Sequence, residues 1–156
     1  MEQIHLMVGN IGTGKTTTAK RIMKENALTM YVADDTICDM VNLGDYSPAM
    51  WGDRYWPIYS EIKNSIAEII LANGFSIIVD STNTSKKRRA NWTAKAKELD
   101  VKITAYVHLD HEAGLERRKA EPRGQTPEMW QKVHDDLQVK YEETTLDEGF
   151  FAVNVI

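Results

Sequence analysis

The stretch GNIGTGKTT, from Gly9 to Thr17, constrains the fold of this chain more than any other feature. It fits the pattern G-x-x-x-x-G-K-[ST] and lies between the apolar run IHLMV and a segment with helical periodicity. Glycines allow the backbone to turn its N–H groups inward around an anion, and the N-terminus of a helix adds about half a positive charge. The sequence therefore predicts a phosphate-binding loop between a first strand and a first helix.

The residues of this loop are predicted to bind a nucleotide. Lys15 is expected to reach the β and γ phosphates, and the Thr16 hydroxyl is expected to ligate Mg²⁺. The other loop positions expected around the phosphates are Gly9, Asn10, Ile11, Gly12, Thr13, Gly14 and Thr17. GTPases read guanine with an N/T-K-x-D tetrapeptide, which this sequence does not contain, so ATP is the predicted ligand.

Short apolar runs alternate with longer helical patterns along the chain. The runs are IHLMV, LTMYVA, FSIIVD, KITAYVHL and FFAVNVI, and this rhythm favours a mainly parallel sheet with helices on both faces. Helices are expected over residues 14–26 and from Pro57 to just before Gly74. Ser85, Asp110 and Thr126 are expected to cap three more, ending near residues 99, 120 and 142. A stripe in the second helix is predicted to face the core: Ile58, Ile62, Ile66, Ile69 and Ile70.

Length and composition limit the remaining possibilities. A chain of 156 residues with 42% hydrophobic content suits a single domain. Its apolar runs are far shorter than the roughly 20 residues of a membrane span, and its N-terminus does not resemble a secretory signal, so a cytoplasmic protein is expected. Cys38 is the only cysteine, which excludes an internal disulfide. The net charge of −4 provides no overall attraction to nucleic acid, so a polyanion would need a local basic patch.

Carboxylates follow two of the predicted strands. Asp34 and Asp35 end the run LTMYVA, and Asp80 ends FSIIVD just before Ser81-Thr82-Asn83. Ligands of open α/β sheets bind at the carboxyl ends of the strands, so these side chains are expected beside the phosphate loop. One carboxylate would hold Mg²⁺, directly or through water, while the other accepts a proton from an attacking hydroxyl. Helix capping or turn formation is the alternative role for Asp34 and Asp35.

The segments GNIGTGKTT, YVADDTI and IIVDSTNTSKKRR, followed by an arginine-bearing segment, resemble the kinase domain of the polynucleotide 5′-hydroxyl kinases and their P-loop kinase relatives. The resemblance covers nearly the whole chain and implies a single P-loop kinase domain over residues 1–156, with strand order 2-3-1-4-5. That order would place the Asp80 strand beside the loop and the Asp35 strand outside it. In such kinases the aspartate after the second strand activates the 5′-hydroxyl. This role falls on Asp35, or on Asp34 if the register shifts by one.

Two positions depart from that family. An arginine often precedes the activating aspartate, and phage-type enzymes have another three positions after it that helps to hold the phosphate of the acceptor. This chain has Asp34 and Cys38 there. Together with the acidic net charge, these differences favour an alternative acceptor, namely a nucleoside, sugar or antibiotic hydroxyl. A second alternative is a switch module that binds ATP without an acceptor.

Arginines flank EPRGQTP, the segment that looks able to close over a nucleotide as a lid. Arg123 is the predicted lid residue, and Arg118 or Arg117 is expected near the end of the preceding helix, facing the site. In related chemistry a guanidinium on the transferring phosphoryl group contributes about 10³–10⁵ in rate. Solvent-exposed helix arginines are the alternative for each.

Two further groups are candidates for the acceptor site. The basic run Lys86-Lys87-Arg88-Arg89, with Trp92 and Lys95 nearby, is expected to steer a polyanion, and Arg88 and Arg89 are predicted to bind it. A solvent-exposed charged helix face is the alternative for this run. Trp51, Tyr55 and Trp56 would stack an acceptor base if exposed, with Arg54 on its phosphate, but core packing is the favoured role of these aromatic residues.

The sequence as a whole predicts a kinase that uses ATP and Mg²⁺ and whose acceptor is the 5′-hydroxyl of a nucleic acid end. Lys15 and Thr16 hold the donor, Asp80 organises the metal side and Arg123 closes the lid. Asp35 takes the proton, with Asp34 beside it in the acceptor site.

Overall fold

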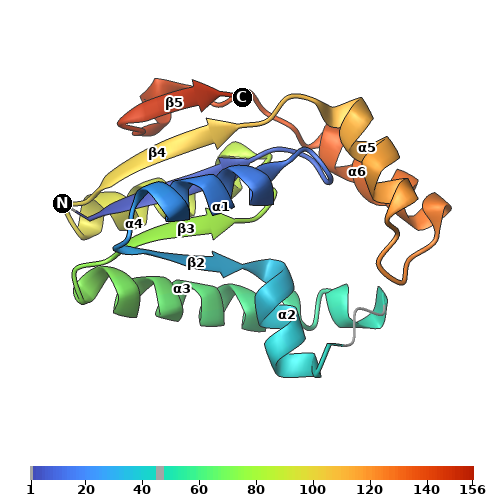
Figure 1. Cartoon of the computed structure of the whole chain (residues 1–156), viewed down its shortest axis with the longest axis horizontal. Helices are drawn as coiled ribbons and strands as arrows, with labels where there is room; N and C mark the ends of the chain where they lie inside the picture. Colours follow the sequence, from blue (N-terminus) through green and yellow to red (C-terminus); the bar gives the residue numbers. More distant parts are fainter. Residues whose placement is uncertain (1, 45–47) are drawn as a thin grey trace.

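The apolar runs form one sheet of five parallel strands within residues 2–44 and 48–156, the part of the chain that the computed structural model describes (Figure 1). The strands are β1 (Gln3–Val8), β2 (Thr29–Ala33), β3 (Ser76–Asp80), β4 (Lys102–Val107) and β5 (Ala152–Val155). Their order is β2-β3-β1-β4-β5, and every pair is parallel. The expected fold class and strand order are therefore confirmed.

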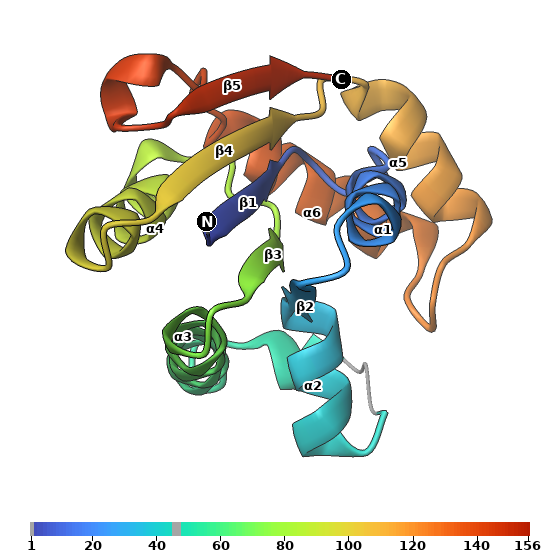
Figure 2. The same cartoon turned by 60° about the vertical axis from the view of Figure 1, so that its left-hand side comes forward.

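Both faces of the sheet are covered, so the central strand is buried from Ile4 to Val8. On one face Met7 packs against α1 (Lys15–Glu25). On the other face Leu6 belongs to the large core that includes residues of α3 (Trp56–Ala72) and α4 (Lys86–Glu98). Figure 2 shows α1 on one side of the sheet and α3 and α4 on the other. No helix in the described residues combines the length and the apolar character that crossing a membrane requires.

The strands all point toward the end of the molecule where α2 (Asp34–Asn42), α5 (His111–Ala120) and α6 (Pro127–Val139) lie (Figure 1). Two short 3₁₀ turns, η1 (Pro48–Trp51) and η2 (Leu146–Glu148), complete the fold. Helix α2 was not predicted, because its nine residues include three β-branched side chains and follow β2 without a break. Burial of Ile37 and Cys38 against the core holds it in place. Its first turn carries Asp34 and Asp35.

Two of the three expected N-caps are confirmed by their side-chain contacts. The Ser85 hydroxyl accepts a hydrogen bond from the Arg88 N–H at 3.4 Å, and the Thr126 hydroxyl accepts one from the Met129 N–H at 3.2 Å. Asp110 precedes α5 but makes no such bond. Helix α6 ends at Val139, before the expected end near residue 142.

The predicted isoleucine stripe of α3 is wrong for two of its members, because Ile58 is 50% exposed and Ile69 is 64% exposed. The buried face is turned by about one residue and consists of Tyr59, Lys63, Ala67, Ile70 and Leu71. Two polar side chains hold this face inward: the Tyr59 hydroxyl donates to the Met50 carbonyl at 2.8 Å, and Lys63 pairs with Asp34 at 2.6 Å. Hydrophobic periodicity does not reveal a buried lysine that has a partner.

Candidate functional site

The phosphate loop turns tightly between β1 and α1. Gly12 has a φ of 67°, and a Cβ there would lie 2.0 Å from the Gly114 carbonyl oxygen of α5. Glycine is thus required both by the left-handed backbone and by the close approach of α5. Asn10 is fully buried and donates to the His134 carbonyl of α6 at 3.0 Å, while its own side-chain oxygen accepts from the Ile11 N–H at 2.7 Å. The Asn10 side chain therefore anchors the loop rather than facing a ligand.

Lys15 lies at the start of α1 and folds back over the loop. Its ammonium donates to the Asn10 carbonyl at 2.5 Å and lies 3.5 Å from the Thr13 hydroxyl oxygen. Burial lowers the pKa of Lys15 to about 8, an effect that Asp80 and Asp35 oppose. An ammonium that has lost so much water would gain strongly from an anionic ligand.

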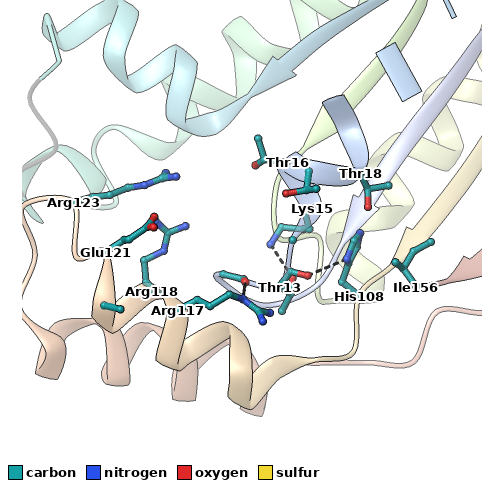
Figure 3. A pocket seen from close by; sticks show the side chains of 14 residues that line it. Thr13, Lys15, Thr16, Thr18, His108, Arg117, Arg118, Glu121, Arg123 and Ile156 are labelled. Atoms are coloured by element: carbon teal, nitrogen blue, oxygen red, sulfur yellow. Dashed lines mark hydrogen bonds between the residues drawn. The ribbon is translucent and has the colours of Figure 1, made fainter. Parts of the chain in front are cut away.

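A cavity of about 650 Å³ opens in front of the loop. Residues 12–18 form one wall, and α5 with the segment after it forms the other, as Figure 3 shows. Arg118 and Arg123 extend from that second wall, with Lys15 and Thr16 across from them (Figure 3). This volume lies in the range of small-molecule sites, and the charges of its walls suit a polyphosphate.

Arg117 and Arg118 lie on the last turns of α5 and act on different partners. The Arg117 Nε donates to the Gly12 carbonyl at 2.9 Å and so ties α5 to the phosphate loop. The Arg118 guanidinium lies 5.1 Å from the ring of Trp130, and burial together with nearby Arg123 lowers its pKa. Both arginines line the cavity, but Arg117 is held by the Gly12 carbonyl and by Asp110.

Asp80 ends β3, which pairs directly with the loop-bearing strand β1. One of its oxygens, Oδ2, accepts hydrogen bonds from the Thr16 hydroxyl at 2.6 Å and from the Tyr31 hydroxyl at 2.9 Å. A hydroxyl beside a carboxylate offers the hard oxygen ligands that Mg²⁺ prefers, and Mg²⁺ usually needs only one or two carboxylates besides phosphate and water. Thr16 and Asp80 therefore fit the metal of a Mg²⁺–nucleotide complex. Sequence reasoning missed Tyr31, because its role depends on the pairing of β2 with β3.

The two neighbouring aspartates of α2 have separate partners, which sequence alone left open. The Asp34 carboxylate accepts a hydrogen bond at 2.6 Å from the buried Lys63, whose ammonium also donates to the Ser81 hydroxyl at 3.1 Å. The Asp35 carboxylate is half exposed and pairs with the Arg123 guanidinium at 3.1 Å. Asp34 therefore belongs to a closed internal network, whereas Asp35 lies beside Arg123 of the segment predicted to act as a lid.

The surroundings of the Asp35 carboxylate raise its pKa. Loss of water around it raises its pKa, and the charges of Arg123 and Arg118 act in the opposite direction. A carboxylate with a raised pKa is a stronger base than one in water, provided that it remains ionised. This electrostatic setting suits the abstraction of a proton.

The prediction that Arg89 binds the acceptor is wrong, because the Arg89 side chain is fully buried. It donates to both carboxylate oxygens of Glu148, at 2.8 and 2.9 Å, and to the carbonyls of Asn83, Thr84 and Glu143. Trp92 is only 3% exposed, so it offers no stacking face. A signal was present in the sequence: Arg89, Trp92 and Ala96 follow helical spacing and form the buried face of α4.

Replacing Arg89 with Lys is expected to lower the free energy of unfolding by about 1–3 kcal/mol, because lysine cannot reproduce a bidentate pair plus three carbonyl contacts. Urea denaturation measures the effect. Arg88→Lys, the same exchange at the adjacent exposed position, is the control and should change stability by less than about 0.5 kcal/mol. Equal effects of the two exchanges would contradict the anchoring role of Arg89.

The other candidates for the acceptor site divide into exposed and packed residues. Arg88 is exposed and donates to the Thr82 hydroxyl at 3.0 Å, with its guanidinium 5.8 Å from the ring of Trp56. Arg54 is also exposed. Three aromatic residues of this region are partly buried against the core, which is the role that the sequence favoured: Trp51, Tyr55 and Trp56.

Comparison with solved structures places this fold among the kinases. A provisionally assigned kinase of Chloroflexus aurantiacus matches with a TM-score of 0.74 at 15% identity, over 99% of this chain and 84% of the other. A fungal RNA kinase matches with a TM-score of 0.63 at 14% identity, over 99% of this chain and 74% of the other. A shikimate kinase from Acinetobacter baumannii is also among the matches. Among curated proteins, no significant sequence match was found.

A chain of the Pnkp1/Rnl/Hen1 RNA repair complex matches with a TM-score of 0.70 at 19% identity, over 89% of this chain. The present chain spans only 45% of that protein's length. At these identities the likeness concerns the fold alone. The family is decided by sequence, since the model of one family matches residues 4–144. The phosphate loop and the arginine-bearing helix α5 lie within that match, so this chain belongs to the AAA domain family and has the P-loop kinase fold.

Proposed function

We propose that this protein transfers the γ-phosphoryl group of ATP to the 5′-hydroxyl of a nucleic acid end. The observation that carries the proposal is the position of Asp35, which pairs with Arg123 of the lid segment and whose charge also acts on Lys15. A protein that only binds ATP does not need a carboxylate at this place. A kinase needs one to take the proton of its acceptor.

The residues of the cavity and the aspartates that follow β2 and β3 divide the reaction between them. The loop amides and Lys15 hold the phosphates, while Mg²⁺, when bound at Thr16 and Asp80, neutralises charge on the β and γ groups. Asp35 takes the proton of the hydroxyl as its oxygen attacks the γ-phosphorus, the bond to the β,γ-bridging oxygen breaks, and ADP leaves. Before this step, the Arg123 guanidinium must leave the Asp35 carboxylate and bind the phosphate oxygens instead. This change also leaves Asp35 available as the base.

The choice of a nucleic acid end as acceptor has support from the fold and from the surface. An RNA kinase and an RNA repair protein share the architecture, and the exposed Arg88 and Arg54 are available for backbone phosphates. The net charge of −4, with Asp34 and Cys38 at the two departing positions, favours a small-molecule hydroxyl instead. A small-molecule kinase is therefore the second candidate.

An acceptor screen with γ-labelled ATP and Mg²⁺ distinguishes these functions. Single-stranded RNA and DNA oligonucleotides with a 5′-hydroxyl are expected to take up label, and the same oligonucleotides with a 5′-phosphate, as matched controls, are not. Label only on a nucleoside, sugar or antibiotic would establish the second candidate. ATP binding without transfer to any acceptor would instead favour a switch module.

A further inference from the structure

Tyr31 connects β2 to the end of the neighbouring strand. In the parallel pairing of β2 with β3, Tyr31 lies opposite Ile78 and Ala33 lies opposite Asp80. Side chains two residues apart on a strand share a face, so Ile78 and Asp80 both point toward α1. The ring of Tyr31 packs partly buried against Ile78 and α1, and from there its hydroxyl reaches Asp80.

The hydroxyls of Tyr31 and Thr16 both donate to the same oxygen of Asp80, Oδ2. A carboxylate oxygen has two lone pairs, so these two donors satisfy it. Within the described residues no donor reaches the other oxygen, Oδ1. Mg²⁺ at a nucleotide usually keeps several of its waters, and each of these can donate to such an oxygen.

We infer that Tyr31 is a positioning residue of the Mg²⁺ site, which orients the Asp80 carboxylate so that Oδ1 remains available to the water shell of the metal. The inference rests on the proposed use of Mg²⁺ and a nucleotide. A tyrosine hydroxyl can donate one hydrogen bond, and Tyr31 directs its own to Asp80 Oδ2 at 2.9 Å. Without this donor, Asp80 keeps only the Thr16 hydroxyl, which itself belongs to the metal site.

Replacing Tyr31 with Phe removes the hydroxyl and keeps the ring packing. Outer partners of metal ligands commonly contribute about 10–100-fold to metal affinity. The Mg²⁺ concentration that half-saturates the enhancement of ADP binding should therefore rise by about 10–100-fold in the variant. ADP affinity in EDTA should stay within about twofold of wild type, because the Tyr31 hydroxyl donates to Asp80, a residue assigned to the metal and not to the phosphates. Calorimetric titration of ADP at fixed Mg²⁺ concentrations and in EDTA measures both quantities without an acceptor.

Tyr106→Phe is a matched control. Tyr106 packs partly buried against the same side of the sheet, but its hydroxyl contacts His5 at 3.2 Å, away from the site. This variant should leave the Mg²⁺ response unchanged. A Tyr31→Phe protein with an unchanged Mg²⁺ response, or with an equal loss in EDTA, would overturn the inference, as would a matching loss in Tyr106→Phe.

A cycle with Asp80 tests whether Tyr31 acts through that carboxylate. In an Asp80→Ala background, adding Tyr31→Phe should reduce the Mg²⁺ response no further, and an additive loss would overturn the inference. If wild type binds ADP without any dependence on Mg²⁺, the inference fails together with the proposed metal site. If wild type responds to Mg²⁺ and Tyr31→Phe responds equally, only the role of Tyr31 fails.

Discussion

Replacing Asp35 with Asn is expected to slow phosphoryl transfer by about 10²–10⁴-fold, the usual contribution of a positioned general base. The amide keeps the shape of the side chain but cannot take the proton of the acceptor. ADP affinity should stay within about fivefold of wild type, because the ion pair that is lost, between Asp35 and Arg123, is half exposed and contributes little to binding. Single-turnover transfer and calorimetric ADP binding, measured on the same preparation, separate the two effects.

Asp39→Asn is the control for this experiment, since Asp39 is an exposed aspartate on the same helix. It should transfer at the wild-type rate. Asp34→Asn is less suitable as a control, because it would leave Lys63 buried without its charge partner and so lower stability. If Asp35→Asn weakens ADP binding as much as it slows transfer, Asp35 is a binding residue and not the base.

The pH profile gives an independent check on the same residue. Partial loss of water raises the pKa of Asp35 above its ordinary value, so the fraction of ionised base decreases as the pH falls through that raised pKa. Transfer by the wild-type protein should therefore decline on the acid side, within a range where an exposed aspartate would still be ionised. The decline should disappear in the residual activity of Asp35→Asn.

Replacing Lys15 with Met is expected to lower ADP affinity by about 10–100-fold, which corresponds to one or two charged hydrogen bonds to phosphate. Transfer should decrease by a larger factor, because the same ammonium also offsets the charge that develops on the γ group. Lys20→Met on the exposed side of α1 is the control and should change neither quantity. An unchanged ADP affinity in Lys15→Met would contradict the assignment of the cavity to phosphate.

The Lys15 variant should also be more stable than wild type when no nucleotide is present. Burial lowers the pKa of Lys15 from 10.5 to about 8, so at pH 7 the folded state carries a charged amine at a cost that the unfolded state does not have. Removing it should raise the free energy of unfolding at pH 7 by roughly 3 kcal/mol, at about 1.4 kcal/mol per pKa unit. Between pH 8 and 10.5 the unfolded state binds more protons, so this group makes wild-type stability rise with pH and the gain from Lys15→Met diminish. Urea denaturation of both proteins at pH 7 and at pH 10 measures the gain in stability and its decrease with pH.

The phosphate loop and the sheet could be predicted because their signals are local. GNIGTGKTT requires a strand before it and a helix after it, and the five apolar runs gave the strands. The strand order came from the family resemblance. Prediction failed where a face was polar or a helix was short: α2 was missed, and the buried face of α3 includes Lys63, which hydrophobic periodicity does not identify.

What the sequence by itself determined was therefore the fold, the phosphate loop and which strand ends carry carboxylates. Only the tertiary structure distinguished the surroundings of Asp34 and Asp35, by placing Lys63 against the first and Arg123 against the second. The structure likewise shows that Arg89 is buried and that the Tyr31 hydroxyl donates to Asp80. The physical reason is that a backbone pattern is set by neighbours along the chain, whereas the charge partner of a side chain comes from an element tens of residues away.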